Sequence, residues 1–461
     1  MKEMTGAEVI KKYNIPVPRY TSYPPANLFS DKYTGDDYRR DILESNRVGS
    51  RSLSFYIHIP FCKNICHFCA CNRILLPSDS GAVATYIDYL HREFELVRPL
   101  LDPTRPITQV HFGGGSPTAI SLDYIGEVIR MLTDSFAPAP QAEVAIEVHP
   151  GFLTYRDWDR LIEMPFTRYS IGLQDLHTDI LKMAGRIPPR VPVGEVVGAI
   201  HDAGKRVNLD LVYGLPGQSV GSFEDNIAQA LEMRPDRLVT FSYAHVPWLH
   251  PGQKVLEQYG LPAAEVKQAM YDRAARMMTA AGYVQIGLDH FVLPDDPLAV
   301  ALQKHSLHRN FQGYCPRDIS GQVYGLGVTG IAQLHDAYAQ NIKTLPEYYS
   351  AIDRGQFPTH VGYKLSREEC LARDLITDLM CNYRTAPLRH AASYGLELKS
   401  LADLPILDSV RLGEMICDGL VEVEGETLVM NPEYHPFVRN VASCFDIHYS
   451  PDAPRGYSRP I

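Results

Sequence analysis

The chain has 461 residues, 45% of them hydrophobic and 21% charged, which is typical of a folded protein and excludes a largely disordered one. Asp and Glu total 54 against 44 Lys and Arg, and the resulting net charge of −10 argues against general affinity for nucleic acid. The sequence shows no apolar run of signal-peptide or membrane-spanning length, so we expect neither export nor a membrane span.

The first 50 residues are rich in Pro and Tyr, and the stretch from Arg19 to Pro25 has no regular period. This pattern favours an extended segment over a helix or a strand. We predict an N-terminal arm over residues 1–50.

Six short runs of β-prone residues follow the arm, and helical patterns separate several of them. Between the first two runs, Ile87, Leu90, Phe94 and Val97 recur at helical spacing and predict one apolar helix face. After the second run, Ser121 is a suitable N-cap for another helix. The runs are Leu53 to Ile59, Ile107 to Phe112, Val144 to Val148, Tyr169 to Leu173, Val207 to Tyr213 and Leu238 to Tyr243.

Alternation of strands and helices predicts an α/β fold with parallel strands joined by crossovers. Six such units fit a partial (βα)6 barrel better than a closed eight-stranded one. We assign this catalytic domain to residues 51–360 and expect its site at the carboxyl ends of the strands.

The alternation stops near residue 360. A helical stretch around Leu365 to Tyr383 precedes a helix-then-hairpin pattern from Met415 to Glu426. We predict a small, mainly helical, winged-helix-like domain over residues 361–461. Its acidic hairpin makes DNA binding an unattractive role.

Four of the nine cysteines lie within ten residues, directly after the first predicted strand. Cys62, Cys66 and Cys69 have the spacing C-x3-C-x2-C, and Cys71 follows. Three thiolate ligands would leave one iron of a four-iron cluster open to a small molecule. A structural zinc site usually takes four ligands from two separated pairs, so the spacing favours an iron–sulfur cluster over zinc or merely buried cysteines. Scattered single cysteines elsewhere indicate a cytoplasmic protein.

Two further features lie where predicted strands end. Gly113, Gly114 and Gly115 precede Ser116, and glycine lets the backbone approach a ligand closely. Glu147 ends the third run, where a carboxylate among apolar residues requires either a ligand or an internal cation as its partner.

The cysteine spacing resembles that of the radical S-adenosylmethionine superfamily. Segments outside the superfamily's shared motifs resemble one family within it, the oxygen-independent coproporphyrinogen III oxidases, over almost the whole chain. Cys71 supports the same family, because the related heme chaperones generally lack this fourth cysteine. The segments are Lys12 to Asn14, Arg19 to Pro24, His308 to Tyr314 and Tyr457 to Ile461.

The resemblance implies a [4Fe-4S] cluster held by Cys62, Cys66 and Cys69, together with two molecules of S-adenosylmethionine. It implies catalytic roles for Tyr56, Glu147 and Gln312. The positions that match cofactor contacts in the family are Tyr56, Phe68, Gly114, Gly115, Ser116, Glu147, Gln174, Arg186, Asp210, Ala244 and Ile331.

The family turns two propionates of coproporphyrinogen III into vinyl groups during heme biosynthesis, using a 5′-deoxyadenosyl radical to remove hydrogen. This chemistry requires an electron donor for the cluster and a terminal electron acceptor, and we expect a monomer. Because the substrate carries four carboxylates and the chain is acidic, cations must gather at the pocket. Arg19, Arg309 and Arg459 lie in the family-like segments and are the candidates.

The chain also departs from the family pattern, most notably at His149, where Asp is usual. Two alternatives share much of the fold. One is a radical enzyme that acts on heme or another substrate as a methyltransferase or cyclopropanase, and the other is a noncatalytic heme chaperone. The arm, Cys71 and the Arg459 segment favour the oxidase over both.

Overall fold

The computed structural model describes residues 6–79, 81–451 and 457. They form two compact units, each built from more than one stretch of the chain. The larger unit comprises Asp31–Ala299 and Ile319–Gly362, and the smaller comprises the described residues among 1–30, 300–318 and 363–461. The predicted bounds at residues 50 and 360 stay predictions.

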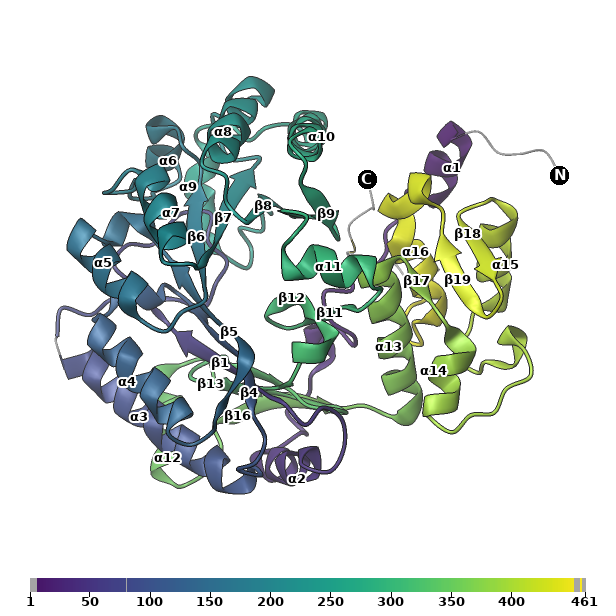
Figure 1. Cartoon of the computed structure of the whole chain (residues 1–461), viewed down its shortest axis with the longest axis horizontal. Helices are drawn as coiled ribbons and strands as arrows, with labels where there is room; N and C mark the ends of the chain where they lie inside the picture. The colour runs from purple at the N-terminus through teal and green to yellow at the C-terminus, as the bar shows by residue number, and fades with distance from the viewer. Residues whose placement is uncertain (1–5, 80, 452–456, 458–461) are drawn as a thin grey trace. The chain divides into compact units, whose positions relative to one another are not determined.

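A twelve-stranded sheet forms the centre of the larger unit, in the order β16-β15-β14-β13-β1-β4-β5-β6-β7-β8-β10-β9 (Figure 1). The strands from β13 to β8 in this order pair in parallel, as the sequence predicts. Each of the six predicted runs coincides with one of these strands. They are β1 (Leu53–Ile59), β4 (Ile107–Gly114), β5 (Pro138–Val148), β6 (Arg168–Gln174), β7 (Arg206–Tyr213) and β8 (Arg237–Ser242).

The structure extends the predicted sheet on both sides. A seventh parallel strand, β13, pairs with β1, and short antiparallel strands continue the sheet beyond β13 and β8. The α/β class with a parallel-rich sheet is therefore confirmed. The added strands are β9 (Val284–Ile286), β10 (His290–Val292), β13 (Gln322–Leu326), β14 (Ile331–Gln333), β15 (Ala337–Asn341) and β16 (Thr359–Lys364).

Helices α3 to α8 lie along the outer side of the strands (Figure 1). In α3, the predicted stripe of Ile87, Leu90, Phe94 and Val97 is buried in the main core, as expected for an amphipathic helix. Ser121 caps α4, accepting a hydrogen bond from Asp123 N at 3.2 Å. The helices of this unit are α2 (Gly35–Ser45), α3 (Gly81–Val97), α4 (Leu122–Thr133), α5 (Tyr155–Glu163), α6 (Thr178–Met183), α7 (Val193–Asp202), α8 (Val220–Glu232), α9 (Lys254–Glu257), α10 (Ala264–Ala280) and α12 (Leu345–Asp353).

The smaller unit has its own apolar core. The predicted helix near residue 365 is α13 (Arg367–Asn382), which begins with a capping box between Ser366 and Glu369. The predicted hairpin is β18 (Val421–Glu424) with β19 (Thr427–Met430), and β17 (Arg384–Thr385) joins it. The winged-helix description stays a prediction. The other helices of the smaller unit are α1 (Gly6–Tyr13), α14 (Pro387–Ser393), α15 (Ser409–Cys417) and α16 (Val438–Ala442). Helix α11 (Pro297–Gln303) belongs partly to each unit.

Among the residues that the structure describes, none of the helices combines the length and the apolar character needed to cross a membrane.

Candidate active site

Polar side chains interrupt the buried strands on one face of the sheet. β1 is buried at every residue except Tyr56, and the partly exposed positions of β4 are His111 and Gly114. Tyr56 pairs with His111 in the strand register, and Glu147 lies two residues beyond the partner of His111 on β5. Since side chains alternate between faces, all three point to the same side of the sheet. Asp210 lies on the same face, because Glu147 pairs with Ser170, Ser170 pairs with Asn208 on β7, and Asp210 is two residues further along β7.

Tyr56, His111 and Glu147 form a connected group near the strand ends. The Nε2 atom of His111 lies 3.0 Å from Oε1 of Glu147, and the Tyr56 ring stacks on His111 with centroids 5.9 Å apart. Burial raises the pKa of Tyr56 well above its usual value, so the phenol stays protonated. The Glu147 side chain is 44% exposed, which leaves its carboxylate room for a second partner.

The glycine run forms the end of β4 beside this group. A Cβ on Gly113 would lie 2.8 Å from Oε1 of Glu147, and one on Gly115 would lie 2.4 Å from the Pro60 carbonyl oxygen. A larger residue at Gly115 would therefore collide with the backbone at Pro60, directly after β1, and one at Gly113 would displace the Glu147 side chain. The run turns the backbone so that Gly115 N and Ser116 N bond to the carbonyl oxygens of Ile59 and Phe61.

The cluster loop, defined here as residues 62–75, is closed at its base by a short parallel ribbon. Cys62 on β2 (Phe61–Cys62) pairs with Leu75 on β3 (Ile74–Leu75). Further along the loop, His67 N donates to the Ala184 carbonyl oxygen at 2.9 Å, and Asn64 Nδ2 donates to the Gly185 carbonyl oxygen at 2.5 Å. The loop is thus fixed both to the end of β1 and to the segment after α6.

The three predicted cluster ligands share this loop. Cys62 and Cys66 are buried, at 8% and 6% exposure, and Cys69 is half-buried. Burial and the neighbouring Cys69 and Cys66 raise the pKa of Cys62 to about 12, while a hydrogen bond from Cys71 lowers that of Cys69 to about 6. Arg186 Nη1 donates to the sulfur of Cys66 at 3.4 Å, which offsets negative charge on that sulfur.

These residues fit the predicted cofactors by their chemistry. As the side chains stand, no three His, Cys, Asp or Glu residues of the described chain form a group that could hold a metal ion. The donor set itself is nevertheless that of an iron–sulfur cluster, with three thiols on one loop and an arginine N–H directed at one sulfur. Glu147 and the glycine run, on the adjacent strand ends, supply a carboxylate and closely approachable backbone for an amino acid group.

Gln174 at the end of β6 shows the clearest sign of a missing ligand. Its backbone is left-handed, with φ of 71°, and its Oε1 atom is buried without a hydrogen-bond partner among the described residues. Strained polar residues of this kind cluster at functional sites. Arg186, whose Nη2 donates to the Gly172 carbonyl oxygen, borders the same place because a Cβ on Gly172 would meet both Gln174 and Arg186.

The remaining predicted cofactor contacts of the larger unit lie on β7, in the cluster loop, after β8 and on β14. Asp210 accepts hydrogen bonds from Ser170 and Asn208 at 2.8 Å, and burial raises its pKa. Phe68 is in the cluster loop, and Ala244 follows β8. Ile331 begins β14, directly after the turn that follows β13.

His149 fulfils the local role that an aspartate would have. Its Nδ1 atom accepts a hydrogen bond from Gly151 N at 3.2 Å, and its ring stacks on Phe152 with centroids 3.9 Å apart. Burial, with Arg186 nearby, lowers the pKa of His149 to about 2, so the ring is neutral. The substitution therefore keeps the acceptor that caps the short helix after β5.

Three other predicted residues lie in the smaller unit. Gln312 forms the turn between β11 (Leu307–Asn310) and β12 (Gly313–Pro316), with its backbone N bonded to Asn310 Oδ1 at 2.9 Å. Arg309 lies over the Tyr314 ring at 4.7 Å, and Arg19 is exposed. Arg459 lies outside the described residues.

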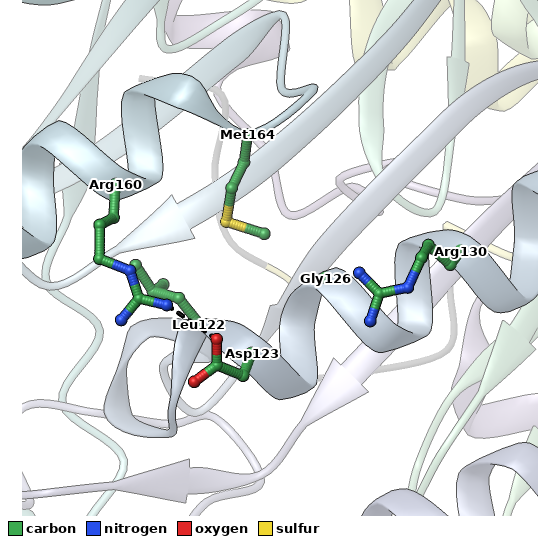
Figure 2. Close-up of a pocket in the computed structure, with 6 residues that line it drawn as sticks. All are labelled: Leu122, Asp123, Gly126, Arg130, Arg160 and Met164. Carbon is green, nitrogen blue, oxygen red and sulfur yellow. Dashed lines mark hydrogen bonds and ion pairs between the residues drawn. The ribbon is translucent and has the colours of Figure 1, made fainter.

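A separate pocket lies on the helical side of the larger unit, between α4 and α5. Figure 2 shows Arg160 on α5 reaching Asp123 at the start of α4, and the two form an ion pair at 2.7 Å. The pocket contains none of the predicted site residues. It is lined by Leu122, Asp123, Gly126, Arg130, Arg160 and Met164.

Sequence reasoning missed His58 and His111. His58 bonds to the Asn72 carbonyl oxygen at 3.0 Å and to the Tyr56 hydroxyl at 3.2 Å, which ties the cluster loop to β1. Both histidines stand inside apolar runs, and a polar residue in a buried strand is the signal that could have identified them.

Comparison with known proteins finds relatives that match almost the whole chain. The family model of the Radical SAM superfamily matches residues 56–230. The oxygen-independent coproporphyrinogen III oxidase of Synechocystis sp. is 36% identical over 453 residues, covering 96% of this chain and 95% of its own length. That of Escherichia coli is 35% identical, covering 95% and 94%. The solved structure of coproporphyrinogen III oxidase from Escherichia coli, described as a radical SAM enzyme, has a TM-score of 0.87 and 32% identity, covering 97% of this chain and all of that one.

Proposed function

This chain belongs to the family of oxygen-independent coproporphyrinogen III oxidases, and we propose that it converts coproporphyrinogen III to protoporphyrinogen IX. The observation that carries the proposal is likeness to such oxidases over at least 95% of each chain, combined with the three-thiol loop at the strand end. The radical SAM relationship brings with it a [4Fe-4S] cluster and S-adenosylmethionine. We further propose two adenosylmethionine molecules per chain, a cytoplasmic monomer, and cluster ligation by Cys62, Cys66 and Cys69.

The bound cofactors supply a 5′-deoxyadenosyl radical as the hydrogen acceptor. Each of two propionates gives up one hydrogen atom, then loses carbon dioxide and one electron, and becomes a vinyl group. An external one-electron acceptor would take this electron, and the cluster would require a separate electron donor. The protein's part is positioning, because a primary radical takes the nearest hydrogen.

We assign the positioning to the residues around the polar face. Glu147, Tyr56 and the Gly114-Gly115-Ser116 turn would hold adenosylmethionine beside the cluster loop. Gln174, Arg186, Asp210, Ala244 and Phe68 would contact the cofactors as well, with Gln312 and Ile331 in the surroundings. The unpartnered Gln174 amide oxygen supports this assignment. The four closely spaced cysteines, Cys62, Cys66, Cys69 and Cys71, are thiols that form no disulfide with one another, which supports a reducing compartment.

The reaction is tested by anaerobic incubation of the reconstituted protein with coproporphyrinogen III, S-adenosylmethionine and a reductant. We expect protoporphyrinogen IX and 5′-deoxyadenosine, separated by chromatography. Methylated or ring-opened heme from a heme substrate would instead support the alternative radical enzyme. Heme binding without adenosylmethionine cleavage would support the chaperone.

Substrate charge gives a second test. We propose that Arg309, with Arg19 and Arg459, binds substrate propionates, since an arginine fork can bond a carboxylate with two N–H groups. Loss of one charge-assisted contact of roughly 1.5–3 kcal/mol should raise the apparent KM of Arg309→Ala for coproporphyrinogen about 10-fold or more. The KM for adenosylmethionine should not change. Unchanged substrate saturation in all three alanine variants would show that the propionates are held elsewhere.

A further inference from the structure

Gln253 is a buried amide that joins two loops at the carboxyl ends of the strands. It is 1% exposed and ends the short helix Pro251–Gln253. Its Oε1 atom accepts from Val246 N at 2.7 Å, and its Nε2 atom donates to the carbonyl oxygens of Phe68 at 3.1 Å and Ala244 at 3.3 Å. All three bonds reach backbone atoms.

The two carbonyls belong to segments that are far apart in the sequence. Phe68 lies in the cluster loop between Cys66 and Cys69, and Ala244 is the second residue of the rim segment, defined here as residues 243–257. The Phe68 side chain packs on a small core that includes Tyr243 and Leu256 of the rim segment. The ring and the carbonyl of Phe68 are therefore both held by the same segment.

The rim segment is also anchored at its two ends. Lys267 Nζ donates to the Tyr243 carbonyl oxygen at 2.7 Å, and His245 bridges the Tyr243 hydroxyl and Glu257 at 2.8 and 3.0 Å. Between these anchors, Trp248 is 73% exposed. Gln253 is thus the buried polar link between a projecting rim and the loop that carries the cluster ligands.

We propose that Gln253 is a positioning residue that holds the Phe68 and Ala244 backbones at a fixed separation in an S-adenosylmethionine subsite. The inference rests on the proposed function, in which Phe68 and Ala244 both contact adenosylmethionine. Without the amide, the partly buried Val246 N–H and Phe68 carbonyl lose this partner, and the backbone must shift to find others. Cys62 and Cys66 need no such adjustment, because the ribbon at Cys62 and the Arg186 contact to Cys66 hold them independently, and Cys69 N bonds to the Cys66 carbonyl oxygen at 3.3 Å.

The chain offers a matched control in Gln218. This amide is 6% exposed and also makes three bonds, accepting from Leu215 N at 2.8 Å and donating to Asp175 at 2.7 Å and the Val212 carbonyl oxygen at 2.8 Å. It lies in the loop after β7, and none of its partners is a proposed cofactor contact. Substitution of Gln218 therefore also removes three hydrogen bonds, but in the loop after β7 and away from Phe68 and Ala244.

The test measures S-adenosylmethionine binding to the anaerobic holoenzyme by equilibrium dialysis, in wild type, Gln253→Met and Gln218→Met. Methionine has similar length and removes only the polar bonds. We expect Gln253→Met to keep wild-type iron content and to bind at least one adenosylmethionine about tenfold more weakly. Gln218→Met should lose a similar amount of thermal stability and bind adenosylmethionine as wild type does.

Tryptophan emission provides a second readout. Of the two tryptophans, Trp158 is 3% and Trp248 is 73% exposed, so quencher-accessible emission comes from the rim segment. The anisotropy of this emission should fall in Gln253→Met and stay constant in Gln218→Met.

The inference is overturned if Gln253→Met binds adenosylmethionine at every site with wild-type affinity, or if Gln218→Met weakens binding equally. If Gln253→Met fails to fold, the same binding measurement is made on Gln253→Asn, because the asparagine amide is too short to reach Val246 and Phe68 together. Wild-type affinity of Gln253→Asn for adenosylmethionine would overturn the inference. A wild-type enzyme that binds no adenosylmethionine refutes the proposed function and this inference with it. Tight wild-type binding with an unaffected Gln253 variant refutes this inference alone.

Discussion

Two carboxylates of the larger unit have opposite surroundings. Glu147, at the end of β5, is 44% exposed and lies 3.0 Å from His111. Glu93, on α3, is 2% exposed and accepts hydrogen bonds from Gly327 N at 2.7 Å, Tyr348 at 2.6 Å and Asn341 at 2.5 Å. The first carboxylate has capacity to bind a ligand, and the second is saturated by the protein.

This difference separates a region that we propose binds cofactors from a region that holds the fold together. The open region consists of Tyr56, His111, Glu147 and the cluster loop, and the closed region consists of Glu93 with Asn341, Tyr348 and the Gly327 turn. The donors around Glu93 fix the turn between β13 and β14, which leads directly to Ile331. A buried polar group keeps its shape only while all its partners are present, so changes in the closed region should act on stability and changes in the open region on cofactors.

The largest effect is expected from Cys66→Ser in the open region. A serine hydroxyl replaces a thiolate ligand, so a second iron of the cluster loses its protein ligand and the cluster is not retained. Iron and sulfide analysis should show loss of nearly all cluster, together with loss of 5′-deoxyadenosine formation. Cys417→Ser is the control, because Cys417 is exposed in the smaller unit. Full cluster content in Cys66→Ser would refute the assignment of the ligands.

The open region could be predicted from sequence because its signals are local. The cysteine spacing, the glycine run and a carboxylate between Ile146 and Val148 all lie within a few residues of a predictable strand end. The closed region could not, because Glu93 and its partner Tyr348 are 255 residues apart. Glu93 is three residues after Leu90 and four before Val97, so the sequence places it on the apolar helix face but does not identify the groups that bond to it. The antiparallel strands β14 and β15 escaped prediction for a similar reason, since each is short and gains stability from its neighbours in the sheet.

An intermediate effect is expected from Glu147→Gln. The amide has the same size and can still bond to His111, but the charge that would attract the adenosylmethionine ammonium is gone. Charge-assisted hydrogen bonds contribute roughly 1.5–3 kcal/mol, so adenosylmethionine binding should weaken about 10-fold or more. Thermal stability without cofactor should change little, because the group is half exposed.

Glu127→Gln is the matched control for Glu147→Gln. Glu127 on α4 is 46% exposed and lies 3.0 Å from His91, so it repeats the same type of pair on the helical layer. Its substitution should leave adenosylmethionine binding unchanged. If Glu147→Gln forms 5′-deoxyadenosine at the normal rate, Glu147 belongs with the structural carboxylates.

The smallest effect on turnover, but a distinct effect on stability, is expected from Glu93→Gln. Burial raises the pKa of Glu93 from 4.5 to about 7, and the hydrogen bonds from Tyr348, Gly327 and Asn341 only partly oppose it. A raised folded-state pKa means that the folded protein binds this proton more tightly than the unfolded chain does. The associated stability is fully present below about pH 4.5, decreases as pH rises, and is lost above about pH 7, a change of about 3 kcal/mol.

Glutamine cannot ionise, so the variant lacks this pH dependence while all other titrating groups stay the same. At pH 5 the variant should be less stable than wild type, because its oxygen can accept from Gly327 N and Tyr348 while its NH2 group then meets the Asn341 NH2 donor, which loses its acceptor at a cost of about 1–3 kcal/mol. Between pH 5 and pH 8 the gap should narrow, because only wild type must bury a charge as the pH rises. Tyr38, Tyr86 and Tyr348 surround Glu93 and do not titrate in this range, since burial raises the pKa of each well above 10. Urea unfolding of both proteins at several pH values measures the gap, and a constant gap would show that Glu93 stays ionised throughout.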